Sequence, residues 1–151
     1  MSDVVSDVVL CEVDGGVATL TLNRPEANNG WTGEMQERFF ELLVQCEADP
    51  DVRAIVVTGA GRSFCPGADM NMLSAAGSRV GTEHAGNVIE TKERRPGYLP
   101  MLIRKPTIAA INGACAGVGL IQALMLDVRI AAEGAKFTVA FSRRGLIAEY
   151  G

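Results

Sequence analysis

The sequence predicts an α/β fold, and three observations lead to that prediction. Apolar runs of strand length occupy residues 52–58, 107–111 and 128–132. Segments with helical spacing of apolar residues precede or separate these runs, and glycine-containing turns join strand to helix. This alternation is typical of a sheet whose strands are linked by crossover connections. The chain has 151 residues, which is enough for one domain with a real core.

The first element in chain order is a predicted β-hairpin. Residues 8–13 and 17–22 flank an Asp-Gly-Gly turn at 14–16, and two short strands around such a turn are typical of a hairpin. Side chains alternate between the two faces of a strand, so one face of the second strand is apolar. The residues that we expect on that face are Ala18, Leu20 and Leu22.

The first helix is predicted to begin after Thr32. The Thr32 side chain can cap the helix N-terminus, and Glu34 places a negative charge in the first turn. The Asp-Pro-Asp sequence at 49–51 ends the helix. Between these signals, apolar residues recur at helical spacing and form one stripe. They are Met35, Phe39, Leu42, Leu43 and Cys46.

Two strand–turn–helix units carry the features that point to chemistry. The strand at 107–111 leads through an Asn-Gly turn to an apolar helix that begins near Gly117 and runs to Leu126. The N–H groups at a helix N-terminus lack intrahelical partners and favour negative charge. A second turn, at 59–70, follows the strand at 52–58 and precedes a helix start at Asp69. Two such units can aim two backbone N–H groups at one oxygen, as in an oxyanion hole.

Composition argues against several classes of protein. The net charge of −4 does not favour a broad nucleic-acid surface. The N-terminus shows no basic region followed by an apolar segment, so no secretory signal is visible. No apolar run approaches the roughly 20 residues that span a bilayer. The four cysteines lack C-x-x-C spacing, which argues against a disulfide framework or a zinc site and favours a reducing cytoplasm.

Five short motifs occur in order along the chain. They are Asn-Arg-Pro-Glu from Asn23, Val-Arg-Ala-Ile-Val-Val-Thr-Gly-Ala-Gly from Val52, Phe-Cys-Pro-Gly-Ala-Asp from Phe64, Lys-Pro-Thr-Ile-Ala-Ala-Ile-Asn-Gly from Lys105 and Asp-Val-Arg-Ile-Ala-Ala from Asp127. These motifs resemble those of the enoyl-CoA hydratase/isomerase (crotonase) superfamily. The resemblance covers only the N-terminal part of the usual family domain. We therefore expect residues 1–151 to be a crotonase-like domain that is incomplete before its C-terminal helices.

The resemblance implies a fold, a substrate class and a site. The fold is a spiral of repeated ββα units, and the substrate is an acyl-CoA thioester. CoA is part of that substrate, so no separate cofactor and no metal are implied. A homotrimer or a hexamer is implied as well. The implied oxyanion-hole donors are the N–H groups of Ala68 and Gly117, and the implied CoA contacts are Ala27, Asn28, Pro66, Ala68, Asp69 and Met70. Capping of the following helix is an alternative role for Asp69, and both roles can hold.

The sequence departs from the hydratases of this family at two positions. Those enzymes hold a water between two glutamates, and the corresponding residues here are Ile121 and Phe141, which cannot accept a proton. The remaining candidate is Glu149, at a loop position where some relatives, including double-bond isomerases and an aryl-CoA dehalogenase, carry a catalytic carboxylate. One carboxylate can remove a proton from one carbon and deliver it to another. We therefore expect Δ3–Δ2 enoyl-CoA isomerisation, and an inert loop glutamate is the alternative.

Several other hypotheses remain open at this point. A 2-enoyl-CoA hydratase of fatty-acid β-oxidation with a non-standard water site is one, and a non-catalytic acyl-CoA-binding protein is another. The Gly-Val-Gly sequence at 117–119 also suggests a dinucleotide-binding module, but Gln122 replaces the third glycine of that pattern. His84 could pair with Cys65 or Cys115 for thiol catalysis, although nothing in the sequence places them together. The polar segment 71–100 is either a substrate lid or a surface connection.

Overall fold

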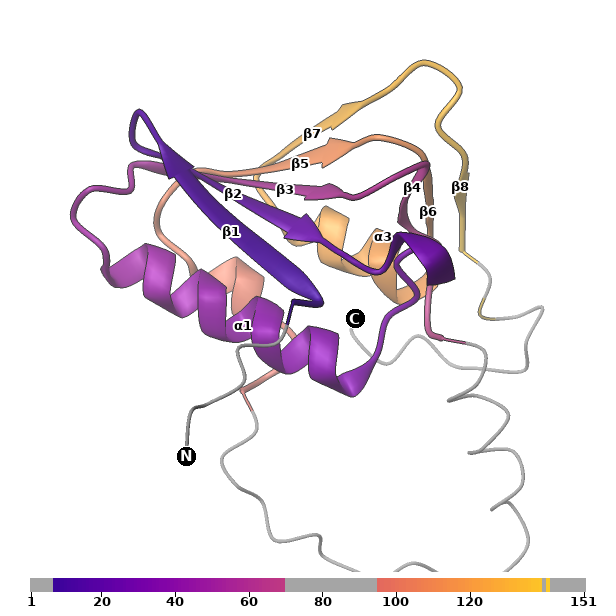
Figure 1. Cartoon of the computed structure of the whole chain (residues 1–151), viewed down its shortest axis with the longest axis horizontal. Coiled ribbons are helices and arrows are strands. Elements are labelled where there is room, and N and C mark those ends of the chain that lie inside the picture. Colours follow the sequence, from indigo (N-terminus) through magenta and orange to yellow (C-terminus); the bar gives the residue numbers. More distant parts are fainter. Residues whose placement is uncertain (1–6, 70–94, 140, 142–151) are drawn as a thin grey trace, which may run out of the picture.

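The N-terminal hairpin has the predicted form in the computed structural model, which describes residues 7–69, 95–139 and 141 (Figure 1). Strands β1 (Val9–Asp14) and β2 (Val17–Leu22) pair antiparallel, with Asp14 opposite Val17. The second strand alternates between buried and more exposed residues. The predicted apolar face is buried, which confirms the period-two pattern for Ala18, Leu20 and Leu22.

A five-stranded sheet forms the main layer of the fold. Its strand order is β1-β2-β3-β5-β7, where β3 is Ala54–Gly59, β5 is Thr107–Ile111 and β7 is Val128–Ala131. All pairs beyond the hairpin are parallel. The carboxyl ends of the parallel strands therefore meet at one edge of the sheet, as is common in α/β proteins that bind ligands there.

A second sheet of three short parallel strands begins beyond that edge. Its strands are β4 (Ser63–Cys65), β6 (Ala114–Ala116) and β8 (Phe137–Thr138), in the order β4-β6-β8. Each follows a strand of the main sheet after a turn, so β3–β4, β5–β6 and β7–β8 are successive copies of one arrangement (Figure 1). This repetition confirms the predicted spiral of ββα units.

The two α-helices within the described residues lie on one side of the main sheet (Figure 1). Helix α1 spans Gly33–Ala48 and begins as predicted, because the Met35 N–H donates to the Thr32 hydroxyl at 3.1 Å. Helix α3 spans Gly117–Leu124 and ends two residues before the expected Leu126. Short 3-10 helices occupy Pro25–Ala27 (η1) and Leu99–Leu102 (η2).

The hydrophobic core lies between the helices and the main sheet. Its largest fully buried side chains come from the α1 stripe, from the inward face of the sheet and from β4. The opposite face of β3 is only half-buried. The core therefore fixes the position of α3 and of the three-stranded sheet relative to the strands that lead into them. The residues with the largest buried volumes are Phe39, Phe40, Phe64, Leu20, Leu22, Met35 and Leu43.

Candidate active site

The two turns that the sequence singles out lie against each other. Gly67 and Gly117 both have positive φ values, 118° and 50°. A Cβ atom on Gly67 would stand 3.9 Å from the Cα atom of Gly117, and a Cβ atom on Gly117 would stand 3.5 Å from the Cα atom of Gly67. A side chain at either position would strain the backbone, since this region of φ favours glycine. The two turns therefore pass close to each other, and the positive φ values explain why both residues are glycine.

A backbone bridge to Trp31 orients the first turn. The Trp31 N–H donates to the Gly67 carbonyl at 2.8 Å, and the Asp69 N–H donates to the Trp31 carbonyl at 3.0 Å. In a parallel bridge these bonds use the residues on either side of Ala68, so the Ala68 N–H points away from Trp31. None of the backbone hydrogen bonds between described residues uses that N–H group. Ala68 is exposed at this point of the surface.

The second turn presents a helix N-terminus. Gly117 is the first residue of α3, and its N-cap residue, Ala116, gives no side-chain hydrogen bond. N–H groups in a first helical turn lack an intrahelical acceptor, and the helix dipole adds positive potential there. An Ala68 N–H and a Gly117 N–H on adjoining backbones are a combination that can bind one developing oxyanion.

A largely buried ion pair braces the turn that carries Ala68. Arg24 Nη1 donates to Asp69 Oδ2 at 3.0 Å and to the Gly30 carbonyl at 2.6 Å. The Arg24 and Asp69 side chains are 21% and 10% exposed. Sequence reasoning named Asp69 as a CoA contact or helix cap but missed Arg24 as its partner. The Asn-Arg-Pro-Glu motif was the signal that could have identified Arg24. The helix that Asp69 was predicted to cap lies outside the described residues.

Two asparagine side chains fix the connection between β3 and β4. Asn29 is fully buried, and its Nδ2 donates to the Ser63 carbonyl at 2.8 Å. Asn112 Nδ2 donates to the carbonyls of Gly61 and Ser63 at 2.9 and 3.3 Å. The sequence analysis interpreted the Asn-Gly pair at 112–113 only as a turn. In the structure this asparagine also ties the two glycine-containing units together, which sets their relative positions.

Three of the predicted CoA contacts lie near one cleft. Ala27 ends η1, Asn28 follows it in a left-handed conformation with φ of 52°, and Pro66 follows β4. Asn28 and Pro66 line a cleft of about 510 Å³. Pro66 immediately precedes Gly67, so the cleft adjoins the turn that carries Ala68. Met70, the remaining predicted contact, lies outside the described residues.

The two positions that the sequence analysis aligned with the hydratase glutamates carry no acid. Ile121 is buried on α3, one helical turn after Gly117, and Phe141 is half-buried. Glu149, the predicted proton carrier, lies outside the described residues. The described part of the site therefore contains the predicted oxyanion-hole residues without the predicted carboxylate.

The cysteines near the two turns are poor candidates for thiol chemistry. Burial raises the pKa of Cys65 to about 11 and the pKa of Cys115 to about 12. Both thiols are therefore protonated at neutral pH, and a protonated thiol is a weak nucleophile. His84, the suggested partner, lies outside the described residues.

The described residues contain neither a cluster of metal-binding side chains nor a long apolar helix. In residues 7–69, 95–139 and 141, no three His, Cys, Asp or Glu side chains gather as metal ligands would. Over the same part of the chain, every helix is too short or too polar to cross a bilayer.

Known proteins resemble this chain over almost its whole length. The enoyl-CoA hydratase/isomerase family model matches residues 12–151. A protein of Mycobacterium tuberculosis named as a probable enoyl-CoA hydratase is 43% identical over 141 residues, which cover 93% of this chain and 53% of that protein. The 1,2-epoxyphenylacetyl-CoA isomerase of Escherichia coli is 41% identical over 148 residues, which cover 96% of this chain and 55% of that protein.

A solved structure gives the same result for the fold. The crystal structure of an enoyl-CoA hydratase from Mycobacterium marinum aligns with a TM-score of 0.73 at 45% identity, over 97% of this chain and 61% of that one. The chain spans about half the length of the curated relatives that it matches. The family model, the relatives and the fold agree, so the chain belongs to the enoyl-CoA hydratase/isomerase family.

Proposed function

We propose that this protein moves the double bond of a 3-enoyl-CoA thioester to the 2-position. A base removes a proton from C2, and negative charge develops on the thioester oxygen. The N–H groups of Ala68 and Gly117 hold that oxygen. The same proton-carrying group then protonates C4, so the product has the mass of the substrate. CoA is part of the substrate, and the reaction uses no separate cofactor.

The close approach of the Gly67 and Gly117 turns is the observation that supports this proposal. The Ala68 N–H is not used in the backbone hydrogen bonds between turns and loops of the described residues, and the Gly117 N–H, in the first turn of α3, has no intrahelical acceptor. Hydrogen bonds from such donors become stronger as negative charge develops on the oxygen. The loss of one donor typically lowers the rate by about 10²- to 10³-fold.

Glu149 is the proposed proton carrier. The two hydratase positions hold Ile121 and Phe141, so a water cannot be held between two carboxylates there. A single carboxylate suffices for isomerisation because the same group can first accept and then donate a proton. The relative at 41% identity is named as a 1,2-epoxyphenylacetyl-CoA isomerase, which supports isomerisation of an acyl-CoA thioester as the general class of reaction.

Two other functions each have an observation in their favour. Several relatives are named as hydratases, including the one at 43% identity, which favours 2-enoyl-CoA hydration with a water held in a different way. Replacement of both hydratase glutamates favours a protein that binds acyl-CoA without turnover.

The test offers a 3-enoyl-CoA and, separately, a 2-enoyl-CoA to the protein. Absorbance follows the conjugated thioester, and mass spectrometry follows the products. We expect conversion of the 3-enoyl substrate without a change of mass. Glu149→Gln should reduce this rate by at least about 10²-fold, since general acid–base catalysis contributes roughly 10²- to 10⁴-fold. Glu12→Gln changes an exposed glutamate on β1 and should leave the rate unchanged.

Each alternative has its own outcome in the same experiment. A gain of one water on the 2-enoyl substrate would identify a hydratase. Binding of both thioesters without turnover would identify a non-catalytic binding protein. Full isomerase activity in Glu149→Gln would remove Glu149 from the mechanism while leaving the oxyanion hole in place.

We also propose a homotrimer or hexamer in the cytoplasm. The family resemblance supports the assembly, and the cysteine usage supports a reducing compartment. Sedimentation analysis tests the assembly directly, and a stable monomer at micromolar concentration would contradict it.

A further inference from the structure

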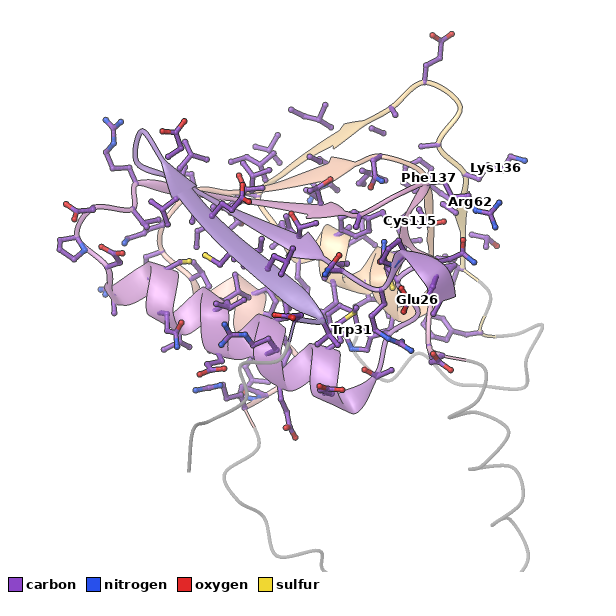
Figure 2. The ribbon with its side chains drawn as sticks, viewed as in Figure 1. Glu26, Trp31, Arg62, Cys115, Lys136 and Phe137 are labelled. Carbon is purple, nitrogen blue, oxygen red and sulfur yellow. The ribbon has the colours of Figure 1, made fainter. Side chains whose placement is uncertain are left out.

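The four cysteines form two pairs in the structure, and the proposed reaction uses neither pair. Cys11 lies on β1 and Cys46 lies on α1, and their Sγ atoms are 3.9 Å apart. Cys65 and Cys115 are partners in the register of β4 and β6, within the three-stranded sheet where Figure 2 shows Cys115. All four are free thiols. The two pairs differ in their access to solvent, and this difference decides which pair can react.

The topology brings Cys11 over the end of α1. Cys11 pairs with Leu20 across the hairpin, and residues directly opposite each other in a sheet point to the same face. Leu20 is fully buried in the core between the sheet and the helices, so Cys11 points to that side as well. Cys46 is the last residue of the apolar stripe of α1 and is 4% exposed. The two sulfur atoms therefore meet where the hairpin packs on the helix.

The two members of this pair differ in access. Cys11 is exposed and lies on the edge strand of the five-stranded sheet, whereas Cys46 is buried. Burial, with a smaller contribution from the neighbouring Cys11, raises the pKa of Cys46 to about 12, so this thiol stays protonated at neutral pH. An oxidant in solution therefore meets Cys11 first, with Cys46 held beside it. Cys65 and Cys115 are both fully buried, so neither of them is open to an oxidant.

We propose that Cys11 and Cys46 form a site of reversible oxidation, at which a peroxide converts the two thiols into a disulfide. The Cys11 thiol loses its proton, and its sulfur attacks one oxygen of hydrogen peroxide. The O–O bond breaks, and a sulfenic acid and one water result. The Cys46 sulfur then attacks the Cys11 sulfur, the S–O bond breaks, and a second water leaves with the thiol proton. The two thiols thus give two electrons to the peroxide, and a dithiol reductant reverses the change by exchange.

A short movement separates the two thiols from a bond. Sulfur atoms in a disulfide are about 2.05 Å apart, so the two Sγ atoms must approach by about 1.9 Å. Cys11 has solvent on one side, and β1 has a neighbouring strand on one edge only, which leaves room for such a shift. In a reducing cytoplasm a disulfide of this kind is transient, which is typical of redox sensing.

The disulfide would close a loop that holds part of the candidate active site. The closed segment contains Arg24 and Trp31, which brace the turn that carries Ala68. Trp31 lies just before α1 (Figure 2). A cross-link of this kind stabilises a fold mainly by restricting the unfolded chain. We therefore expect the oxidised protein to melt about 5–10 °C above the reduced protein.

Peptide mapping of the full chain tests this site. The reduced protein is treated with a small excess of hydrogen peroxide, and an alkylating agent blocks the remaining thiols before digestion. We expect the intact protein to lose two hydrogen atoms and the digest to contain a peptide that links Cys11 to Cys46. Dithiothreitol should restore the original mass and the lower melting temperature.

Two variants separate this pairing from other oxidation. Cys11→Ser changes an exposed residue and should abolish both the linked peptide and the rise in melting temperature. Cys115→Ala is the matched control, because it removes a cysteine of the other pair and should leave the link at the parental level. Circular dichroism establishes that each variant is folded.

Three results would overturn the proposal. The first is a link between Cys65 and Cys115 in place of the expected one. The second is a bond between two copies of the chain through Cys11. The third is oxidation of Cys11 beyond the sulfenic acid while Cys46 stays free. These measurements need no substrate, so their outcome does not depend on the proposed reaction.

Discussion

Asp127 and Thr107 form a closed set of hydrogen bonds between the starts of β5 and β7. Asp127 Oδ2 accepts the Thr107 N–H and the Thr107 hydroxyl, each at 2.8 Å. The same hydroxyl accepts the Asp127 N–H at 3.1 Å. Both hydrogen bonds favour the ionised form and so lower the pKa of Asp127 below its ordinary value of 3.8. The bond from the Thr107 N–H is the larger cause, and the bond from the hydroxyl is the smaller one. This single carboxylate therefore helps hold two strands in register.

The lowered pKa of Asp127 predicts a pH-dependent contribution to stability. The folded protein binds the proton less well than the unfolded chain, so the ionised group stabilises the fold above the ordinary value of 3.8. This contribution is lost as pH falls through the lower, folded pKa. Asp127→Asn should therefore reduce the free energy of unfolding at pH 7 and have a much smaller effect near pH 2. Urea denaturation from pH 2 to 7 measures this difference.

Thr107→Ser provides the control for that measurement. It keeps both donors to Asp127, so the pH dependence should match that of the parent. An Asp127→Asn variant whose loss of stability is the same at every pH would contradict the linkage.

At the scale of elements, the fit between α3 and β4 depends on Gly119. A Cβ atom on Gly119 would stand 2.6 Å from the Cβ atom and 2.7 Å from the Sγ atom of Cys65, and closer still to the Cys65 carbonyl oxygen. Helix and strand thus touch at a point where only a glycine fits. The same helix begins at Gly117, so this contact also sets where the Gly117 N–H lies relative to Ala68.

Gly119→Ala should destabilise the protein despite the better helix propensity of alanine. Propensity alone would stabilise by about 1 kcal/mol. Overpacking against a strand backbone typically costs about 1–3 kcal/mol. A cost at the upper end of that range, less the propensity gain, leaves an expected net loss of about 2 kcal/mol. Gly33→Ala is the matched control, because Gly33 starts α1 and a Cβ atom there meets nothing within 4 Å. Urea denaturation should show little change or a slight gain for the control, and equal stability of both variants would argue against the tight contact.

The elements that the sequence predicts correctly have a clear period or are apolar runs of strand length. The hairpin and α1 show periods of two and 3.6, and β3 and β5 are apolar runs. Strands β4 and β6 were interpreted as parts of turns. Each has only three residues, and glycine lies close to both. Such segments carry no periodic signal, and they become strands only because they pair with each other.

At the scale of the whole molecule, the candidate site could be predicted only in part. The resemblance led to Ala68 and Gly117, and the two strand–turn–helix units indicated that two backbone N–H groups can be aimed at one oxygen. The Arg24–Asp69 pair and the bridge from Trp31 were missed because they join residues far apart in the chain.

The parallel pairing of the main sheet has a consequence for how the chain folds. The hairpin and α1 are close in sequence, whereas Ile55 pairs with Thr107 across a long intervening segment. Bringing the two ends of such a segment together costs conformational entropy, and this cost comes before the stabilising contacts form. Pairings between distant residues therefore form late. A two-stranded hairpin alone is marginal, and α1 supplies the apolar face that it needs.

Refolding should therefore proceed from the N-terminal third toward the rest of the sheet. In pulse-labelling hydrogen exchange during refolding, we expect the amides of β1, β2 and α1 to be protected before those of β5 and β7. Simultaneous protection of all five strands would contradict this order. The two backbone N–H groups of the candidate oxyanion hole would then come together only in the last stage, when β4 and β6 pair, so acyl-CoA binding would report completion of folding rather than its beginning.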